Sequence, residues 1–576
     1  MTTPTVLAAS GLAHSRAAAP GRRRWRIAVP LAAATVAGLM AAVGPLSSPA
    51  AHADTHPWFL PGNLVVSRSV YVGQASLFTP GVTELPPGCP TSAGGCTPAV
   101  ADGTYPGVFN NDGPDASFGV TSPIFLDQIT PDGHLINTLA VPDGDGRRGG
   151  TGDHVVTSFS SKSELALNLS TNGRDLTFMG YLAQPNSVDV SNSNTPGVID
   201  PTNPVSGADY RVVAQVNQSG HIHYTLTNAY SGNNGRAAIL NNSGGSDVVY
   251  TAGNAGNGGN PQPDGIITGT GAQIMTPQHA PESVQTPGAA TPVGSFNVTQ
   301  LGDKIDKVGK DTNFRGLTIF NNVVYFTKGS GSNGVNTVYF IDTTGKACPS
   351  GVGVPEPGAT LPTSPIDYNP ALVASQGVTP YNMCILQGFP TSLAKATTPA
   401  PMFPFGMFFA NKDTLYVADE GDGSDTFSAA TGTFTDAAAQ TTAGLQKWVF
   451  NGTSWTLAYT LTAGLNLGTP YTVKGYPTGD NAATGLPWAP ATDGLRNITG
   501  QVNRNGSVTI WAVTSTVSGS GDQGADPNKL VAITDDPSST APGAHEQFTT
   551  VRSAGFGEVL RGVSFTPGTG LGGFGR

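Results

Sequence analysis

Charged residues are scarce in this chain. Of its 576 residues only 11% are Asp, Glu, Lys or Arg, and 38 acidic residues outnumber 28 basic ones, which gives a formal net charge of -10. Nucleic-acid binding needs a basic surface that this balance does not supply. The same balance argues against attraction to an anionic membrane. We therefore expect neither nucleic acid nor lipid as a partner.

Cysteine is also rare. The chain has four, Cys89 and Cys96 close together and Cys348 and Cys384 on either side of a Pro/Gly-rich stretch. Local pairing is the simplest of the three connectivities that four cysteines allow. A zinc site is the alternative, but neither pair has a CxxC spacing or a nearby His cluster. Two disulfides that pin long loops are typical of an exported protein.

Long hydrophobic runs are absent except at the N-terminus. An Arg cluster at 22–26 precedes an Ala/Val/Leu-rich stretch at 27–43, and Ala-His-Ala at 51–53 suits a signal peptidase. We expect a signal peptide at 1–53, exported by the general or the twin-arginine route, and a single domain at 54–576. An uncleaved anchor is the alternative, which the Pro and Gly residues of the run disfavour. The mature protein is then predicted to be extracellular, with no stable membrane anchor.

The residues that are abundant indicate an all-β protein. There are 76 Gly and 46 Pro, and the apolar residues form short runs rich in Val, Thr, Ile and Phe. One motif recurs: an apolar residue, an Arg, a small or amide residue and then a β-like run. It reads FRGLTIF from Phe314, LRNITG from Leu495 and LRGVSF from Leu560, with a looser copy, GRAAIL, from Gly235. Such self-similarity is typical of a repeat architecture.

FRGLTIF and LRNITG each open a unit of four predicted strands, and PFGMFFA, from Pro404, opens another between them. The units recur at roughly 70 to 90 residues, a layout typical of propeller blades with insertions. We predict a β-propeller of six four-stranded blades, with seven as the alternative if residues 253–300 hide further strands. The chain ends soon after LRGVSF, an innermost-type strand without its blade, whereas GNLVVSRSV, IFLDQIT and LINTLAV near the start lack an innermost strand. Pairing of the N- and C-terminal strands would close the ring and remove exposed sheet edges.

The repeated Arg is predicted to lie at the channel mouth that carries the long loops, where function usually sits. The four positions are Arg236, Arg315, Arg496 and Arg561. A ring of Arg side chains would suit a carboxylate, a phosphate or a uronate. The alternative is a structural brace, because acidic residues precede three of the Arg residues by three or four positions: Asp311, Asp493 and Glu558.

Other site candidates are carboxylates. Asp419, Glu420 and Asp422, in ADEGDGSD, form an oxygen-rich loop that would hold calcium, although an exposed acidic hairpin gives the same pattern. Glu164 and Glu558 are the carboxylates best placed for general acid/base chemistry in the channel. The sequence contains no complete catalytic motif and leaves open whether the protein is an enzyme.

Two functions fit these residues. The first is a secreted, monomeric protein that binds a polar or anionic small molecule or a glycan at the loop-rich mouth. The second is a hydrolase or lyase, with calcium as a helper, acting at the same face. Aromatic residues of the mouth loops would stack on sugars in either case; they are Trp488, Phe403 and Tyr476.

Several segments carry a family resemblance. LYVADEGDG, GLQKWVFNGTSWTLAYTL and LRGVSFTP resemble segments of uncharacterised secreted bacterial β-propeller proteins, and more distantly six-bladed propellers of the NHL, gluconolactonase-like and β-propeller phytase groups. In the phytase group ADE-type strand ends contribute calcium ligands, which the resemblance would place at Asp419 and Glu420. The chain lacks the DAxDDPAxW signature of that group, so phytate hydrolysis is not implied.

Overall fold

The computed structural model describes residues 57–89, 95–141, 154–200, 203–245, 247–254, 271–278, 282–283, 293–295, 297–298, 313–329, 334–363, 382–394 and 401–570. The chain divides into two compact units, residues 1–55 and 56–576, and all of these residues belong to the second. The expected signal peptide at 1–53 lies outside the described residues. No helix within them is long and apolar enough to span a membrane.

Four sheets have the blade layout of a propeller, since in each of them four strands follow one another as an antiparallel meander. The first has β11 (Gly235–Asn241), β12 (Val248–Gly253), β13 (Ala272–Met275) and β15 (Val293–Ser295). The second has β17 (Phe314–Phe320), β18 (Val323–Lys328), β19 (Thr337–Asp342) and β21 (Asn382–Leu386), to which the short β16 (Asn297–Val298) and β20 (Val352–Gly353) add. The third has β22 (Pro404–Asn411), β23 (Thr414–Asp419), β26 (Gly444–Phe450) and β27 (Trp455–Leu461), and the fourth has β28 (Ala491–Val502), β29 (Val508–Val517), β30 (Lys529–Asp535) and β31 (Thr549–Ser553). The first strands of three of these sheets carry the predicted motif: GRAAIL in β11, FRGLTIF in β17 and LRNITG in β28.

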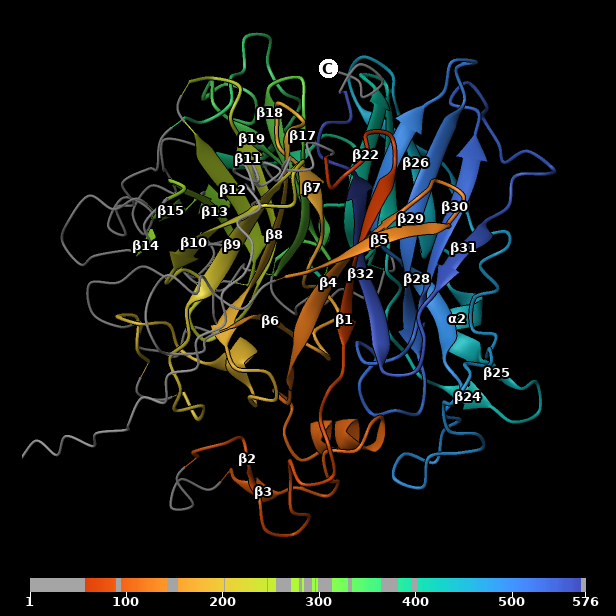
Figure 1. Ribbon diagram of the computed structural model, residues 1–576. Coiled ribbons are helices and arrows are strands. Elements are labelled where there is room, and N and C mark those ends of the chain that lie inside the picture. Colours follow the sequence, from red (N-terminus) through yellow and green to blue (C-terminus); the bar gives the residue numbers. More distant parts are fainter. Residues whose placement is uncertain are drawn as a thin grey trace, which may run out of the picture. The chain divides into compact units, whose positions relative to one another are not determined.

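The remaining blade-like strands form one ten-stranded sheet (Figure 1). Its order is β14 (Glu282–Ser283), β10 (Ile222–Thr227), β9 (Arg211–Asn217), β8 (Asp175–Ala183), β6 (His154–Ser158), β4 (Thr121–Ile129), β1 (Leu64–Val70) and β32 (Glu558–Phe565), with β5 (Leu135–Ala140) on β4 and β7 (Asn168–Leu169) on β8. β6 makes the sheet continuous because it pairs with both β4 and β8. The sequence pattern predicts a connection between blades at about 142–163, and β6 corrects this expectation.

The two ends of the described chain meet in this sheet. β1 pairs antiparallel with β32, from Leu64 opposite Phe565 to Val70 opposite Glu558, with one irregularity between Ser67 and Arg68. In Figure 1 the red β1 accordingly runs beside the dark blue β32. The predicted closure by terminal strands is therefore present.

The four strands that carry the repeated motif, β11, β17, β28 and β32, form a ring of contacts together with β22 and β7. β11 contacts β17, β17 contacts β22, β22 contacts β28, β28 contacts β32, and β7 contacts both β32 and β11. The glycine after the Arg allows this close approach: a Cβ on Gly316 would lie 2.3 Å from the carbonyl oxygen of Phe405, and a Cβ on Gly562 would lie 2.3 Å from that of Leu165. In β28 the amide of Asn497 takes the place of glycine, and its Oδ1 accepts a hydrogen bond from the backbone N–H of Val563. The small or amide residue of the motif thus brings neighbouring blades together.

The apolar core lies between the faces of neighbouring sheets. One cluster joins side chains of β11–β13, β17–β21 and β22–β26, and in it the rings of Phe320 and Phe409 stack at 4.5 Å. A second cluster joins β22–β27 to β28–β30. β-branched and aromatic side chains on both faces of each blade supply these contacts.

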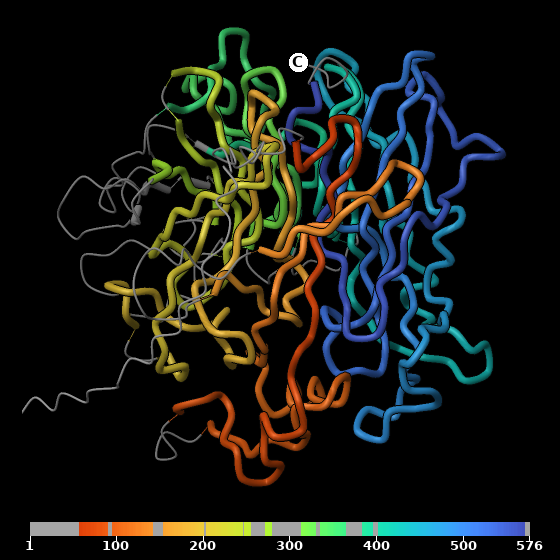
Figure 2. Tube along the Cα trace, in the orientation of Figure 1, coloured from red at the N-terminus to blue at the C-terminus, as the bar shows by residue number. Residues whose placement is uncertain are grey.

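Short elements occupy the connections. They are β2 (Glu84–Leu85), β3 (Thr97–Pro98) and the 3-10 helix η2 (Gly107–Asp112) between β1 and β4, η3 (Val190–Asn192) after β8, and β24 (Phe427–Ser428), β25 (Thr433–Phe434) and α2 (Thr435–Ala439) between β23 and β26. Figure 2 shows the β1–β4 connection extending beyond the ends of the strands that it joins. Aromatic rings anchor it, since Phe109 of η2 stacks on Phe159 at 5.6 Å.

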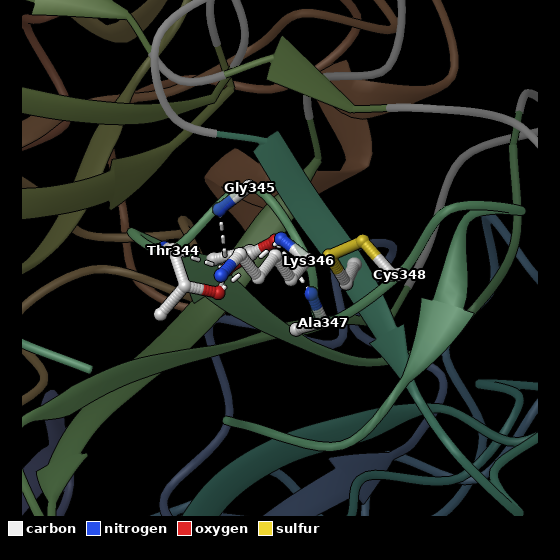
Figure 3. The surroundings of a disulfide bond; sticks show 7 residues. Thr344, Gly345, Lys346, Ala347 and Cys348 are labelled. Carbon is white, nitrogen blue, oxygen red and sulfur yellow. Dashed lines mark hydrogen bonds between the residues drawn. A yellow bond between two sulfur atoms is a disulfide. The ribbon is translucent and has the colours of Figure 1, made fainter. Parts of the chain in front are cut away.

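Both predicted disulfides are present, Cys89–Cys96 and Cys348–Cys384. Cys348 follows a turn at 344–347 whose backbone N–H groups donate to the carboxylate of Asp342 (Figure 3). Cys384 lies in β21, so the second bridge ties this turn to the outermost strand of its blade. Local pairing is therefore confirmed.

Candidate functional site

The four repeated Arg residues are buried together around the axis of the strand ring. Arg236, Arg315, Arg496 and Arg561 lie in β11, β17, β28 and β32, and each is 3–5% exposed. Neighbouring members interact electrostatically, Arg236 with Arg315, Arg315 with Arg496, and Arg496 with Arg561. The sequence correctly predicted that these positions converge.

One carboxylate links two of these Arg residues. Glu420 follows β23, and its Oε1 lies 3.3 Å from Arg315 Nη2, whereas its Oε2 lies 3.2 Å from Arg496 Nε. Burial by itself raises the pKa of Glu420, but the surrounding Arg and Lys side chains outweigh burial and lower it. Glu420 is therefore ionised and braces three successive blades.

The other two Arg residues form no ion pair with any described residue. Arg236 donates from Nε to Asn234 Oδ1 at 3.1 Å, and from Nη1 to the amide oxygen of Asn313 and the carbonyl of Phe314. Arg561 donates to Ser69 Oγ and to the carbonyl of Ser161, and its buried Nη2 has no hydrogen-bond partner there. Burial lowers the pKa of both groups, that of Arg561 to about 9. Neither guanidinium group is thus directly paired with a described carboxylate, although carboxylates lie near enough to act on both.

Two of the acidic partners expected from sequence spacing, Asp493 and Glu558, have partners other than these Arg residues. Asp493 accepts hydrogen bonds from Gly423 N and Gln440 Nε2, and burial raises its pKa to about 7. Glu558 pairs with Arg68 of β1 at 2.6 Å. Asp311 lies outside the described residues. Residues three apart on a strand point to opposite faces, so this spacing places Glu558 away from Arg561.

A cavity of about 520 Å³ opens at this end of the strand ring. Arg236 and Arg315 line it, together with Lys162 and residues from several connections. These further lining residues include Asp112, Ser117, Ser160, Ser161, Ser163, Asn192, Asn234, Asn313, Asp425, Asp522 and Gln523. Most come from the β1–β4, β6–β7, β8–β9 and β29–β30 connections, whereas Asn234 and Asn313 precede β11 and β17 and Asp425 follows β23, which agrees with the predicted loop-rich mouth.

Three charged residues of this cavity were missed by the sequence analysis. Lys162 precedes β7 and donates to Gln523 Oε1 at 3.2 Å, and burial lowers its pKa. Asp112 ends η2, and burial together with Asp522 and Asp115 raises its pKa to about 8. Asp522 lies in the β29–β30 connection, and its pKa is raised mainly by burial. No motif surrounds these residues, so only the fold reveals their meeting.

A second cavity, of about 700 Å³, lies at the opposite end of the innermost strands. Its walls come from all six of them, through residues such as Leu169, Ile239, Phe320, Phe408 and Phe565. None of its lining residues carries a charge. Charged side chains therefore line the cavity at one end of the channel, and none line the cavity at the other end.

Glu164 is fully engaged in hydrogen bonds. Its carboxylate accepts from Thr157 Oγ1 at 2.6 Å, from Ser158 N at 3.0 Å and from the Tyr181 hydroxyl, and Asn234 Nδ2 lies 3.4 Å away. The side chain is only 1% exposed. These contacts favour a role in fixing the β6–β7 connection, and a catalytic role for Glu164 or Glu558 stays an untested prediction.

The calcium prediction also stays untested, but its residues have other partners. The Asp419 carboxylate accepts from the backbone N–H of Phe403 and of Gly421, and burial raises its pKa to about 7. Asp422 is exposed and accepts from Gln440 Nε2. Within the described part of the chain, one cluster of His, Cys, Asp or Glu has metal-binding spacing, and two of its members, Cys348 and Cys384, form a disulfide.

The aromatic residues proposed for sugar stacking are largely used inside the protein. Tyr476 is 6% exposed, and its hydroxyl donates to Asp526 at 2.6 Å, so this prediction is wrong. Trp488 packs edge-on against the ring of Tyr476 at 6.5 Å. Phe403 is half-buried. The fold uses these rings to hold the mouth loops together.

No protein-family model matches the sequence, and no curated protein matches it. Among solved structures, the polysaccharide lyase Uly1 aligns with a TM-score of 0.30 at 9% identity, over 71% of this chain and 76% of that one. This similarity identifies neither a family nor an activity. The resemblance to NHL, gluconolactonase-like and phytase propellers has no family match behind it.

Proposed function

We propose that the protein is a secreted six-bladed propeller whose arginine-lined cavity binds an anionic small molecule or an acidic glycan. The blade count is supported by the ring of six innermost strands, with the ten-stranded sheet read as two blades that β6 joins. Export is supported by the two disulfides.

The arginine side chains at the cavity carry the proposal. Five cations interact with one another in this region, Lys162, Arg236, Arg315, Arg496 and Arg561, and the first three of them line the cavity. The carboxylates that act on these cations are Asp112, Glu164, Glu420, Asp493 and Asp522. Within the described part of the chain none of them forms an ion pair with Arg236 or Arg561, and Arg561 Nη2 has no hydrogen-bond partner.

Buried positive charge without a partner is costly. A carboxylate or phosphate that enters the cavity would relieve this cost, and planar guanidinium groups bind such anions through paired hydrogen bonds. Arg236 is the best ligand-binding residue, because it lines the cavity and has only neutral partners. The serine and asparagine side chains of the wall would meet the hydroxyl groups of a sugar acid.

Calorimetric titration with galacturonate, glucuronate and inorganic phosphate, and with galactose as the neutral comparison, tests this proposal. We expect the anions to bind and galactose not to bind. A ligand at a hundred times its dissociation constant would also stabilise the fold by about 2.7 kcal/mol in thermal unfolding. Binding should weaken as salt is added, since the interaction is between charges.

Arg236→Gln is the informative variant, because it removes a cavity cation without leaving any carboxylate unpaired. We expect at least about a tenfold loss of affinity, equivalent to about 1.4 kcal/mol. Arg504→Gln, at an exposed position, makes the same charge change and is the matched control. Equal binding of galactose and galacturonate, or unchanged affinity in Arg236→Gln, would refute the proposal.

A further inference from the structure

The arginine-lined cavity also contains a pair of carboxyl groups. Asp112 at the end of η2 and Asp522 of the β29–β30 connection both line the cavity, and both are half-buried, so they are not sealed from it. Neither of the predicted acids, Glu164 and Glu558, lines this space with a free carboxylate. The same cavity is thus lined by cations and by these two carboxyl groups.

Backbone contacts fix the two connections against each other. A Cβ on Gly521 would lie 2.6 Å from the carbonyl oxygen of Phe109 and 3.3 Å from the Cα of Asn110, so the segments touch. Asn481 joins them as well, because its Nδ2 donates to Asn110 Oδ1 at 2.7 Å and to the carbonyl of Gly519. These contacts fix the position of Asp112 relative to Asp522, and the two carboxyl groups lie near enough to interact electrostatically.

The surroundings of the two groups differ. Asp522 Oδ1 accepts from the backbone N–H of Gly524 at 2.6 Å, and Lys162 and Arg561 act on this carboxylate. Asp112 has other acids, Asp522 and Asp115, among its main charged neighbours, and only Lys162 opposes them. Asp112 therefore keeps a proton at neutral pH. Asp522, in contrast, has a backbone N–H donor and two cations that stabilise its negative charge.

We propose that Asp112 and Asp522 are the general acid and the general base of a glycoside hydrolase site that acts on a glycan carrying a sugar acid. The inference rests on the proposed function, because the cations at Arg236 and Arg315 would hold the carboxylate of the sugar. Asp112 gives its proton to the glycosidic oxygen as the bond from that oxygen to the anomeric carbon breaks. Asp522 takes a proton from a water molecule whose oxygen bonds to the anomeric carbon. The net reaction consumes one water and releases two hydroxyl-ended sugars, so no oxidant, metal or cofactor is needed.

The test is a reducing-end assay of the full-length mature protein on polygalacturonate, alginate and hyaluronan, in water enriched in oxygen-18. We expect cleavage of at least one of these polymers, with the heavy oxygen in the new reducing end. Asp112→Asn and Asp522→Asn should each lower the rate on the order of 10²-fold or more. Asp480→Asn, an exposed acid of a mouth loop, is the charge-matched control and should cleave like the wild type.

The pH profile of the unmodified protein gives a measurement that does not depend on the folding of a variant. Because burial and the neighbouring acids raise the pKa of Asp112 to about 8, the rate should fall above about pH 8 as the acid loses its proton. A rate that keeps rising beyond pH 9 would contradict this role for Asp112. So would variants of normal thermal stability that cleave as fast as the wild type.

Failure of the catalytic pair is distinguishable from failure of the anion site. If galacturonate binds in calorimetry but none of the three polymers is cleaved, the hydrolase is refuted and the binding protein stands. If galacturonate, glucuronate and phosphate all fail to bind, the proposed function falls, and the acid–base inference falls with it. Cleavage without incorporation of the heavy oxygen would indicate an elimination reaction and would overturn the role of Asp522.

Discussion

Glu420 provides the sharpest test of how the blades are held together. Its carboxylate lies 3.3 Å from Arg315 and 3.2 Å from Arg496, and all three side chains are 4–6% exposed. At an effective dielectric constant of about 20, each contact contributes roughly 5 kcal/mol of attraction, most of which offsets the cost of burying the charges. Glu420→Gln keeps the shape but removes the charge, so two buried guanidinium groups lose this carboxylate. Loss of one member of a buried pair costs about 3 to 5 kcal/mol.

Urea unfolding at pH 7 should therefore show the free energy of unfolding of Glu420→Gln lowered by at least about 3 kcal/mol. Glu356→Gln, at an exposed position, is the control and should change it by less than about 0.5 kcal/mol. Because the folded-state pKa of Glu420 is lowered, its stabilisation is complete above its unfolded pKa of about 4.3 and disappears as the pH falls through the folded value. The difference between wild type and variant should shrink accordingly in acid. A loss below about 1 kcal/mol at pH 7 would refute the brace.

Three further outcomes follow from other buried groups. Lys447→Met leaves Asp535, which lies 3.1 Å from the Lys447 ammonium with both side chains fully buried, without its cation, so urea unfolding should show a loss of about 3 to 5 kcal/mol. The double change Cys348→Ser and Cys384→Ser opens a loop of 36 residues and should lower the free energy of unfolding by about 4 kcal/mol under non-reducing conditions, with no loss under reducing ones. Burial and a neighbouring carboxylate raise the pKa of Asp189 to about 9, so the stability of the wild type should fall as the pH rises from about 4 to 9, by up to about 1.4 kcal/mol per pH unit from this group. Asp189→Asn lacks this dependence, and parallel stability–pH curves of the two proteins would contradict the assignment.

The strands of the propeller were largely predictable because their signals are local. Alternating apolar residues and turn pairs such as Asn321-Asn322, both with positive φ, mark hairpins without reference to the rest of the chain. β6 was missed because His154–Ser158 follows a Gly-rich segment and has no hairpin partner next to it in sequence. Its pairing with β4 and β8 comes from the fold.

The candidate site was predictable only in part. The repeated Arg could be placed because it begins a recognisable strand, whereas its partners come from other blades. Glu420 meets Arg496 from 76 residues away, and Arg68 meets Glu558 from 490 residues away. Asp112 and Asp522 belong to irregular connections, where spacing carries no information about contact. Convergence of this kind depends on closure of the ring.

That closure also has a mechanical side. Leu64 is the first residue of β1 and Phe565 is the last residue of β32, and the two lie opposite each other at the same end of the ladder. A force applied to the termini therefore opens the ladder one hydrogen bond at a time, like a zipper, and does not load all the bonds together in shear. A single molecule stretched between its ends should give way first at this seam, at low force, however resistant the ring is to heat or denaturant.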